Sequence, residues 1–198
     1  MRRTNRRCKS LWVLLPMFIG GWCGPAAREG AQAGDAVSAD IVHGAWQHHN
    51  VAFNYASFTS LYTCDGLEDH VRQMLRYLGA RKDVRVSATG CPGTFHTPGS
   101  TSFVNTDFYS LTPGDAGEHE AVEAGWTALS LGPRRPDFMG EGDCELVQAM
   151  KDLITKNFSL RTLQYRTDCV PNEVSLDSYA VKGQLLKPLP SNSKPVKG

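Results

Sequence analysis

The chain has 198 residues, enough for one domain with a sizeable core, and its 21 Lys and Arg residues nearly balance its 20 Asp and Glu residues. The charges are unevenly distributed along the chain. Residues 1–33 hold six basic residues and one acidic residue, whereas the remainder has a formal net charge of −4. That remainder has no basic field and no apolar run of about 20 residues, so nucleic-acid partners and a membrane span in the mature chain are excluded.

Residues 1–33 have the three-part pattern of a secretory signal peptide. A positively charged start is followed by the apolar stretch 11–19 and then by Ala31 and Ala33, small residues that a signal peptidase accepts. The apolar stretch is too short to span a bilayer. We therefore expect residues 1–33 to be removed on export and the mature protein to be periplasmic or secreted. An uncleaved N-terminal anchor is the alternative interpretation.

The mature part is expected to form a single α+β domain over residues 34–187, with a leader at 34–45 and a flexible tail at 188–198. Alternation of apolar and polar residues marks the strands, and helical periodicity marks the helices. The predicted elements are, in chain order, a strand at 51–63, a helix at 65–78, strands at 84–90, 102–111 and 121–131, a second helix after Asp143, and strands at 160–168 and 174–186.

The two predicted helices carry the same apolar stripe. In the first helix it consists of Leu67, Val71, Met74, Leu75 and Leu78. In the second helix its first four positions recur as Leu146, Met150, Leu153 and Ile154. The chain thus contains the order β-α-β-β twice, as pseudo-repeats at about 51–112 and 120–187. This order predicts a duplicated, ferredoxin-like (split βαβ) sheet with two helices on one face, and chance similarity of two helix–strand units is the alternative.

Four cysteines remain beyond the signal peptide, namely Cys64, Cys91, Cys144 and Cys169. Four cysteines in an exported chain usually form two disulfides, with three possible connectivities. Each predicted helix runs about 21 Å in one direction, and the strand after it runs back about 23–30 Å. Because the chain returns to its start, we expect Cys64–Cys91 and Cys144–Cys169, one disulfide in each half.

Three short segments of the first half form a recognisable pattern. They are Cys64-Asp-Gly-Leu-Glu68, Leu78-Gly-Ala-Arg81 with Asp83, and Gly90-Cys91, within residues 51–91. This pattern resembles a signature of small uncharacterised exported proteins of Gram-negative bacteria. The resemblance implies a bacterial source and export, and it carries no activity.

The histidines before the first predicted strand are candidates for a metal site. His43, His48 and His49 are close in sequence, and imidazole is the usual ligand of copper and zinc. However, adjacent residues of a strand point to opposite faces. We therefore expect solvated histidines, with no metal and no cofactor.

The loop at 132–142 contains the most concentrated basic spot of the mature chain. Arg134 and Arg135 lie between two prolines, and Phe138 follows them. Charge and an apolar ring together could bind an anion or a partner, so these three residues are the candidate binding site. A solvated loop is the alternative.

No motif for nucleophilic catalysis or phosphate binding occurs in the sequence, and we expect no catalytic residue. The sequence favours an exported, non-enzymatic module that binds an unidentified protein or small-molecule partner. Two alternatives remain: a periplasmic copper- or zinc-handling protein that uses the histidines, and a small exported hydrolase with an unrecognised Asp/His/Ser set.

Overall fold

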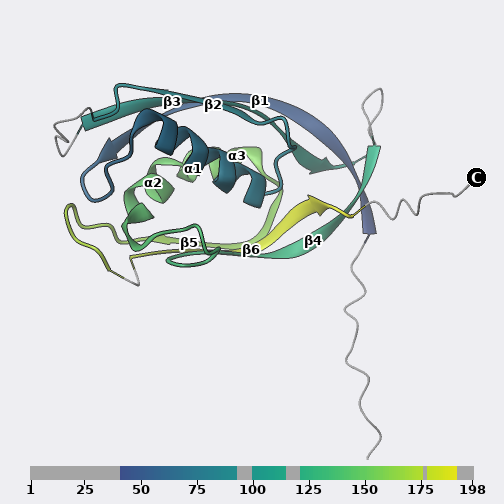
Figure 1. Cartoon of the computed structure of the whole chain (residues 1–198). Coiled ribbons are helices and arrows are strands. Elements are labelled where there is room, and N and C mark those ends of the chain that lie inside the picture. The colour runs from purple at the N-terminus through teal and green to yellow at the C-terminus, as the bar shows by residue number, and fades with distance from the viewer. Residues whose placement is uncertain (1–40, 93–99, 115–120, 176–177, 191–198) are drawn as a thin grey trace, which may run out of the picture. The chain divides into compact units, whose positions relative to one another are not determined.

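The computed structural model describes residues 41–92, 100–114, 121–175 and 178–190 (Figure 1). The predicted signal peptide and most of the predicted tail lie outside these residues. In chain order the elements are β1 (Ile41–Ser57), α1 (Cys64–Tyr77), β2 (Arg85–Thr89), β3 (Ser100–Pro113), β4 (Ala121–Leu131), the 3-10 helix η1 (Glu141–Asp143), α2 (Cys144–Ala149), α3 (Lys151–Asn157), β5 (Leu160–Thr167) and β6 (Tyr179–Pro188). The described chain is therefore an α+β fold, as expected.

The six strands form one antiparallel sheet in the order β2-β3-β1-β4-β6-β5. The first half of the chain supplies β1, β2 and β3, and the second half supplies β4, β5 and β6. The halves join where residues 41–45 of β1 pair with residues 121–125 of β4. Figure 1 shows the three α-helices between the two halves of the sheet, with β1, β2 and β3 on one side and β4, β5 and β6 on the other. Among the described residues, no helix has the length and apolar character needed to cross a membrane.

The first helix matches its predicted stripe, because Leu67, Val71, Met74 and Leu75 are all buried. Its N-cap is Thr63, whose hydroxyl accepts a hydrogen bond from the Gly66 N–H. The Glu68 carboxylate accepts a hydrogen bond from the Ala88 N–H of β2 at 2.9 Å. Glu68 therefore ties the helix to the edge of the sheet rather than closing the first turn.

The second predicted helix is divided at Met150 into α2 and α3. The ψ angle of Met150 is 0°, which departs from the helical value, although the Met150 N–H still bonds to Leu146 O and the Ile154 N–H to Met150 O. The predicted stripe is buried, with Leu146, Met150, Leu153 and Ile154 at 2% exposure or less. The predicted helical stripe is therefore confirmed, but its residues belong to two helices instead of one.

The first and last strands begin and end at other residues than predicted. β1 begins at Ile41, so residues 41–45 are not a leader, and it ends at Ser57 rather than at Thr63. β6 begins at Tyr179 rather than at 174, and it includes Pro188. Residues 41–45 become strand because they pair with β4, which belongs to the other half of the chain. Local alternation carries no signal of such a distant pairing.

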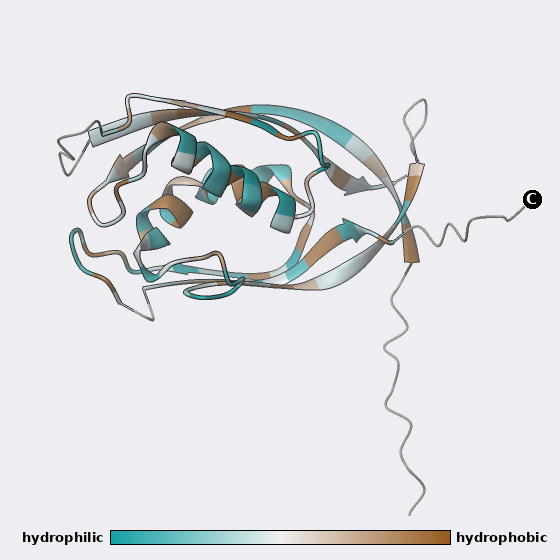
Figure 2. Ribbon diagram, viewed as in Figure 1, coloured by the Kyte–Doolittle hydropathy of each residue, from teal (hydrophilic) through white to brown (hydrophobic). Residues whose placement is uncertain are grey.

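A small hydrophobic cluster lies at the junction of the two halves, separate from the main core around the helices. It consists of Val42, Trp46, Leu111, Val122, Ala124, Trp126 and Leu186, and we call it the junction core. Figure 2 shows hydrophobic residues at this place, where the start of β1 crosses β4 and the end of β6. Leu111, Ala124 and Leu186 are buried, and the two tryptophans are partly exposed above them.

The predicted cysteine pairing is confirmed. Cys64 is bonded to Cys91 and Cys144 to Cys169, with Cα–Cα distances of 5.4 and 5.6 Å. In each half the disulfide joins the start of a helix to the end of the strand that follows it. Each disulfide thereby fastens a helix to its own half of the sheet.

Replacing Cys64 and Cys91 together by serine should lower the free energy of unfolding by about 3–4 kcal/mol, because the unfolded chain regains the entropy of a loop with a sequence separation of 27. A similar loss is expected for Cys144 and Cys169, with a separation of 25. Urea unfolding monitored by circular dichroism measures both losses. A loss below about 1 kcal/mol for either pair would contradict the expectation.

Candidate functional site

The turn after α1 places a basic segment against β3. Gly79 has a φ angle of 86°, a left-handed conformation that favours glycine, and it ends the helix. Two residues later the Arg81 N–H donates a hydrogen bond to Tyr109 O at 3.0 Å. Arg81 therefore lies beside β3 before β2 begins, and its position is fixed by the backbone.

The Arg81 guanidinium is held by a carboxylate and two aromatic rings. Its Nε and Nη2 donate to the two carboxylate oxygens of Asp83 at 2.9 and 2.6 Å. Its Cζ lies 3.7 Å from the ring centre of Tyr109 and 6.0 Å from that of Trp46. The hydrogen bonds from Arg81 keep the pKa of Asp83 below its usual value. Arg81 thus joins the Leu78–Asp83 segment to the aromatic residues of β1 and β3.

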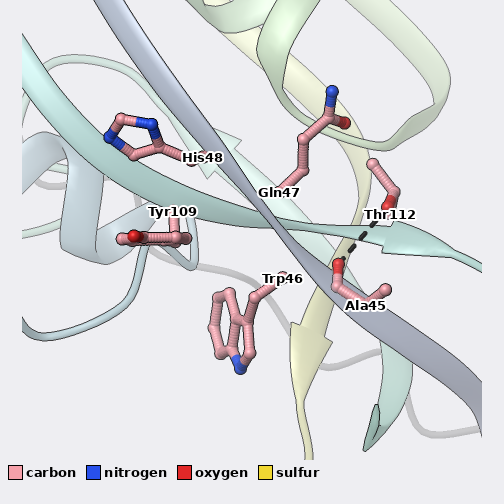
Figure 3. A pocket seen from close by; sticks show the side chains of 6 residues that line it. All are labelled: Ala45, Trp46, Gln47, His48, Tyr109 and Thr112. Atoms are coloured by element: carbon pink, nitrogen blue, oxygen red, sulfur yellow. Dashed lines mark hydrogen bonds between the residues drawn. The ribbon is translucent and has the colours of Figure 1, made fainter. Parts of the chain in front are cut away.

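Trp46, His48 and Tyr109 share one face of the β1–β3 ladder. His48 lies directly opposite Tyr109, with ring centres 4.9 Å apart. Figure 3 shows these three side chains, while Gln47 and Thr112 point away from the Trp46 ring. Together with Ala45, these residues line a hollow of about 600 Å³.

A second hollow of about 750 Å³ shares Trp46 with the first, and we call it the Trp46 cleft. Its lining residues are Trp46, Arg76, Gly79, Ala80, Arg81, Lys82, Lys187 and Pro188. They come from the start of β1, the end of α1 with the following turn, and the end of β6. Half of these residues are cationic.

The cleft has more positive than negative charge. Asp83 neutralises Arg81, but Arg76, Lys82 and Lys187 form no ion pair within the described part of the chain. The Lys187 ammonium is half-buried, 4.7 Å from the ring centre of Tyr77, and its burial lowers its pKa. A cation removed from water without a counter-ion is costly. The cleft is therefore electrostatically suited to an anion.

A buried polar network connects α1 with η1. His70 Nε2 lies 3.0 Å from Asp143 Oδ2, the Tyr62 hydroxyl donates to Asp143 Oδ1, and the Gly140 N–H donates to Asp143 Oδ2 at 2.6 Å. Burial alone would raise the pKa of Asp143, but the hydrogen bond and charge of His70, with those of the other donors, lower it. Burial also raises the pKa of Tyr62, which stays a protonated donor. The His70 side chain is only 11% exposed.

The loop residues singled out from the sequence, Arg134, Arg135 and Phe138, differ in their surroundings. Arg134 forms an ion pair with Glu141, and Arg135 is exposed. The Phe138 ring packs edge-on against His70 and Tyr77, with ring centres 5.8 and 6.2 Å away. Because its ring packs against the buried network, Phe138 does not extend the basic surface.

The three candidate histidines are spread over both faces of β1. His48 Nε2 lies 3.2 Å from Asp107 Oδ2, and His49 Nε2 lies 2.9 Å from Ser110 Oγ. His43 is exposed and belongs to the segment that pairs with β4. Among the described residues, no group of three or more His, Cys, Asp or Glu side chains could hold a metal ion.

The Trp46 cleft was not recognised from the sequence, although part of it carried a signal. Arg81 belongs to the Leu78–Asp83 segment of the family-like pattern. Trp46 lay just after a presumed leader, outside the predicted strands, and Lys187 was the last residue of the presumed domain. These residues meet only because the two halves of the sheet join at the β1–β4 ladder.

Comparison with known proteins does not identify the chain: no protein-family model, curated protein or solved structure matches it. The geometry of the described residues is therefore the basis for a functional conclusion.

Replacing Asp143 by asparagine should lower the free energy of unfolding by about 3 kcal/mol at pH 7, because His70 and Tyr62 lose a buried carboxylate partner. The folded-state pKa of Asp143 is depressed, so its contribution is present above the unfolded pKa of about 3.9 and is lost as the pH falls through the lower folded pKa. The difference between wild type and variant should therefore shrink below about pH 4.

Urea unfolding at several pH values measures this difference. Asp69→Asn is the matched control, since Asp69 lies on the same helix and makes an exposed ion pair with Arg72. Equal losses for Asp143→Asn and Asp69→Asn would contradict a stabilising role for the buried network.

Proposed function

We propose that this protein is an exported, non-enzymatic binding module that holds a carboxylate-bearing ligand in the Trp46 cleft. The observation that carries the proposal is the half-buried Lys187 ammonium, which has no carboxylate partner within the described residues. It lines the same hollow as Arg76 and Lys82, which are also without an acidic partner there.

A ligand carboxylate would replace the water that these cations lose. Charge-assisted hydrogen bonds to ammonium and guanidinium groups are stronger than neutral ones, and their strength increases away from bulk water. Trp46 and Pro188 add apolar contact area to the same walls. The volume of about 750 Å³ falls within the usual range for ligand sites.

The two other functions considered from the sequence have less support. Metal handling would require His43, His48 and His49 to converge, and they are divided between two faces of β1. A hydrolase would require a nucleophile next to a base at an open site. His49 lies beside the Ser110 hydroxyl, but Ser110 is buried and its hydroxyl donates to Asn157 O. The only His–carboxylate pairs among the described residues are His70–Asp143, which is buried, and His48–Asp107, which is exposed.

Export is supported by the covalent structure. Both disulfides join secondary structure elements, and structural disulfides persist in oxidising compartments. The N-terminal pattern of residues 1–33 agrees with this, although it lies outside the described residues. Periplasmic or secreted localisation therefore belongs to the proposal.

We infer further that the domain arose by duplication of a β-α-β-β unit. In the first half β3 lies between β1 and β2, and in the second half β6 lies between β4 and β5. Each half therefore has the three-stranded core of a split βαβ unit, with helix and disulfide in equivalent places. Two such three-stranded units joined edge to edge account for the six-stranded sheet. A single ferredoxin-like sheet would have four strands.

Equivalent side chains support the same origin. Trp46 and Trp126 have the same separation in sequence as Cys64 and Cys144. Trp46 pairs with Leu111 on the neighbouring strand, and Trp126 pairs with Leu186. The junction core therefore contains a tryptophan–leucine pair from each half.

Replacing Lys187 by methionine should weaken the binding of a tetraglutamate peptide about tenfold, the value of one charge-assisted hydrogen bond. Calorimetric titration at low and moderate salt measures the affinity, which should fall with ionic strength. Lys156→Met is the matched control, because Lys156 is an exposed lysine of α3 that pairs with Asp152 and does not line the cleft. Equal affinities of the two variants would remove Lys187 from the site.

The pH dependence of stability checks the electrostatic basis of the site. The folded-state pKa of Lys187 is lowered, so the unfolded state binds more protons between that pKa and the ordinary value of 10.5. The stability contribution of Lys187 should therefore rise with pH in this window. In the Lys187→Met variant the free energy of unfolding should not show this rise with pH, and at pH 7 it should be no lower than that of the wild type. Denaturant unfolding between pH 7 and 11 measures both. A destabilised variant at pH 7 would contradict the prediction.

A further inference from the structure

The second half of the sheet repeats the pairing of arginine with tryptophan that lines the Trp46 cleft. Arg161 Cζ lies 3.8 Å from the ring centre of Trp126, while Arg81 lies over Tyr109 and Trp46. Arg81 and Arg161 have the same separation in sequence as the two tryptophans. The two Trp–Arg pairs therefore occupy equivalent places in the two halves.

A β-bulge holds Arg161 over its ring. The β5–β6 register shifts between Arg161 and Gln164, and Thr162 has a φ angle of 50°. Gly183 faces this bulge on β6, where a Cβ atom would lie 2.8 Å from Arg161 O. Only glycine permits this close approach of the two strands. The backbone conformation of the bulge therefore fixes the position of Arg161.

Both Trp–Arg pairs lie on the same face of the sheet. Val42 is opposite Ala124 in the β1–β4 ladder, and side chains alternate along a strand, so Trp46 and Trp126 share the face of that pair. Both rings pack against the junction core. The face thus carries an apolar strip with an arginine against an aromatic ring at each end. At the Trp46 end Arg81 is neutralised by Asp83, and the cations without an acidic partner among the described residues are Arg76, Lys82 and Lys187 of the adjoining cleft.

The spacing of the two ends suits an extended chain. Ala45 pairs with Ala121. Trp46 lies one residue beyond this pair, and Trp126 lies five residues from it in the opposite direction, so about 20 Å separates the two tryptophans along the ladder at 3.3 Å per residue. A peptide of about six extended residues covers this distance. A single small carboxylate does not.

The cationic side chains at the Arg161 end also lack an acidic partner among the described residues. Arg161 forms no ion pair within the described residues, and the exposed Lys182 lies on the neighbouring strand. The complement of this face is a segment with carboxylates about six residues apart and apolar side chains between them. Val42 and Val122, the partly exposed aliphatic residues of the junction core, supply apolar contact for that centre.

We propose that the two Trp–Arg pairs are the two ends of one docking surface for an extended acidic segment of a partner protein. This inference rests on the proposed carboxylate site in the Trp46 cleft and extends it across the junction core. Arg161 would hold the second acidic group, and the strip between Trp46 and Trp126 would contact the apolar residues.

Two eight-residue peptides of identical composition test the arrangement with the full chain. The two-ended peptide has a pair of glutamates at each end and four apolar residues between them, and the one-ended peptide has all four glutamates at one end. The two-ended peptide should bind about tenfold more tightly in calorimetric titration, since it makes one further charge-assisted contact. Equal affinities would overturn the two-ended surface and leave the Trp46 site standing.

Variants locate the second end. Arg161→Ala should remove the preference for the two-ended peptide and leave the affinity for the one-ended peptide unchanged. Gln184→Glu should do the same without removing the arginine, since residue 184 pairs with Arg161 across the ladder. Arg166→Ala is the matched control, because Arg166 lies on the same strand and pairs with Asp168. Loss of the preference in the control as well would contradict the assignment to Arg161.

The remaining outcomes also decide between proposals. If neither peptide binds to the wild-type protein, both the carboxylate site and the docking surface are overturned. If a hexameric oligogalacturonate binds more tightly than the two-ended peptide, the face belongs to an acidic saccharide and the peptide proposal is overturned.

Discussion

The ladder between β1 and β4 is the contact on which the rest of this fold depends. It contains five residue pairs, and within the described residues it is the strand pairing that joins the two halves of the sheet. Because the halves lie on opposite sides of the helices, this junction lets two three-stranded units enclose one core (Figure 1). The junction core then covers the ladder with apolar side chains from both halves.

The remaining constraints fasten the helices to this frame. Each disulfide ties a helix to the strand that follows it, and the Asp143 network ties α1 to the segment before α2. The disulfides and the Asp143 network hold the helices in place, and none of their residues lines the Trp46 cleft. The end of α1 meets the end of β6 beside the ladder, and their cations gather there around Trp46. The proposed site is therefore a consequence of how the halves join.

The sequence predicted those parts of the structure that depend on neighbouring residues. The stripe of Leu67, Val71, Met74 and Leu75 correctly predicted α1. The lengths of each helix and of the strand that runs back beside it correctly predicted which cysteines are bonded. The β-α-β-β order was also correct in both halves. The packing of Phe138 was not predicted, because its ring contacts His70 and Tyr77, which belong to α1 in the other half of the chain.

The sequence by itself therefore determined the α+β class, the order of strands and helical segments, and the disulfides, since periodicity and short loops act between residues that are close in the chain. Only the tertiary structure decided the length of β1, the burial of His70 and the composition of the Trp46 cleft. Trp46 and Lys187 lie near opposite ends of the described chain, and they line one hollow because β1 pairs with β4 and β4 pairs with β6. Such pairing depends on the complementary faces of distant strands, and no local pattern encodes it.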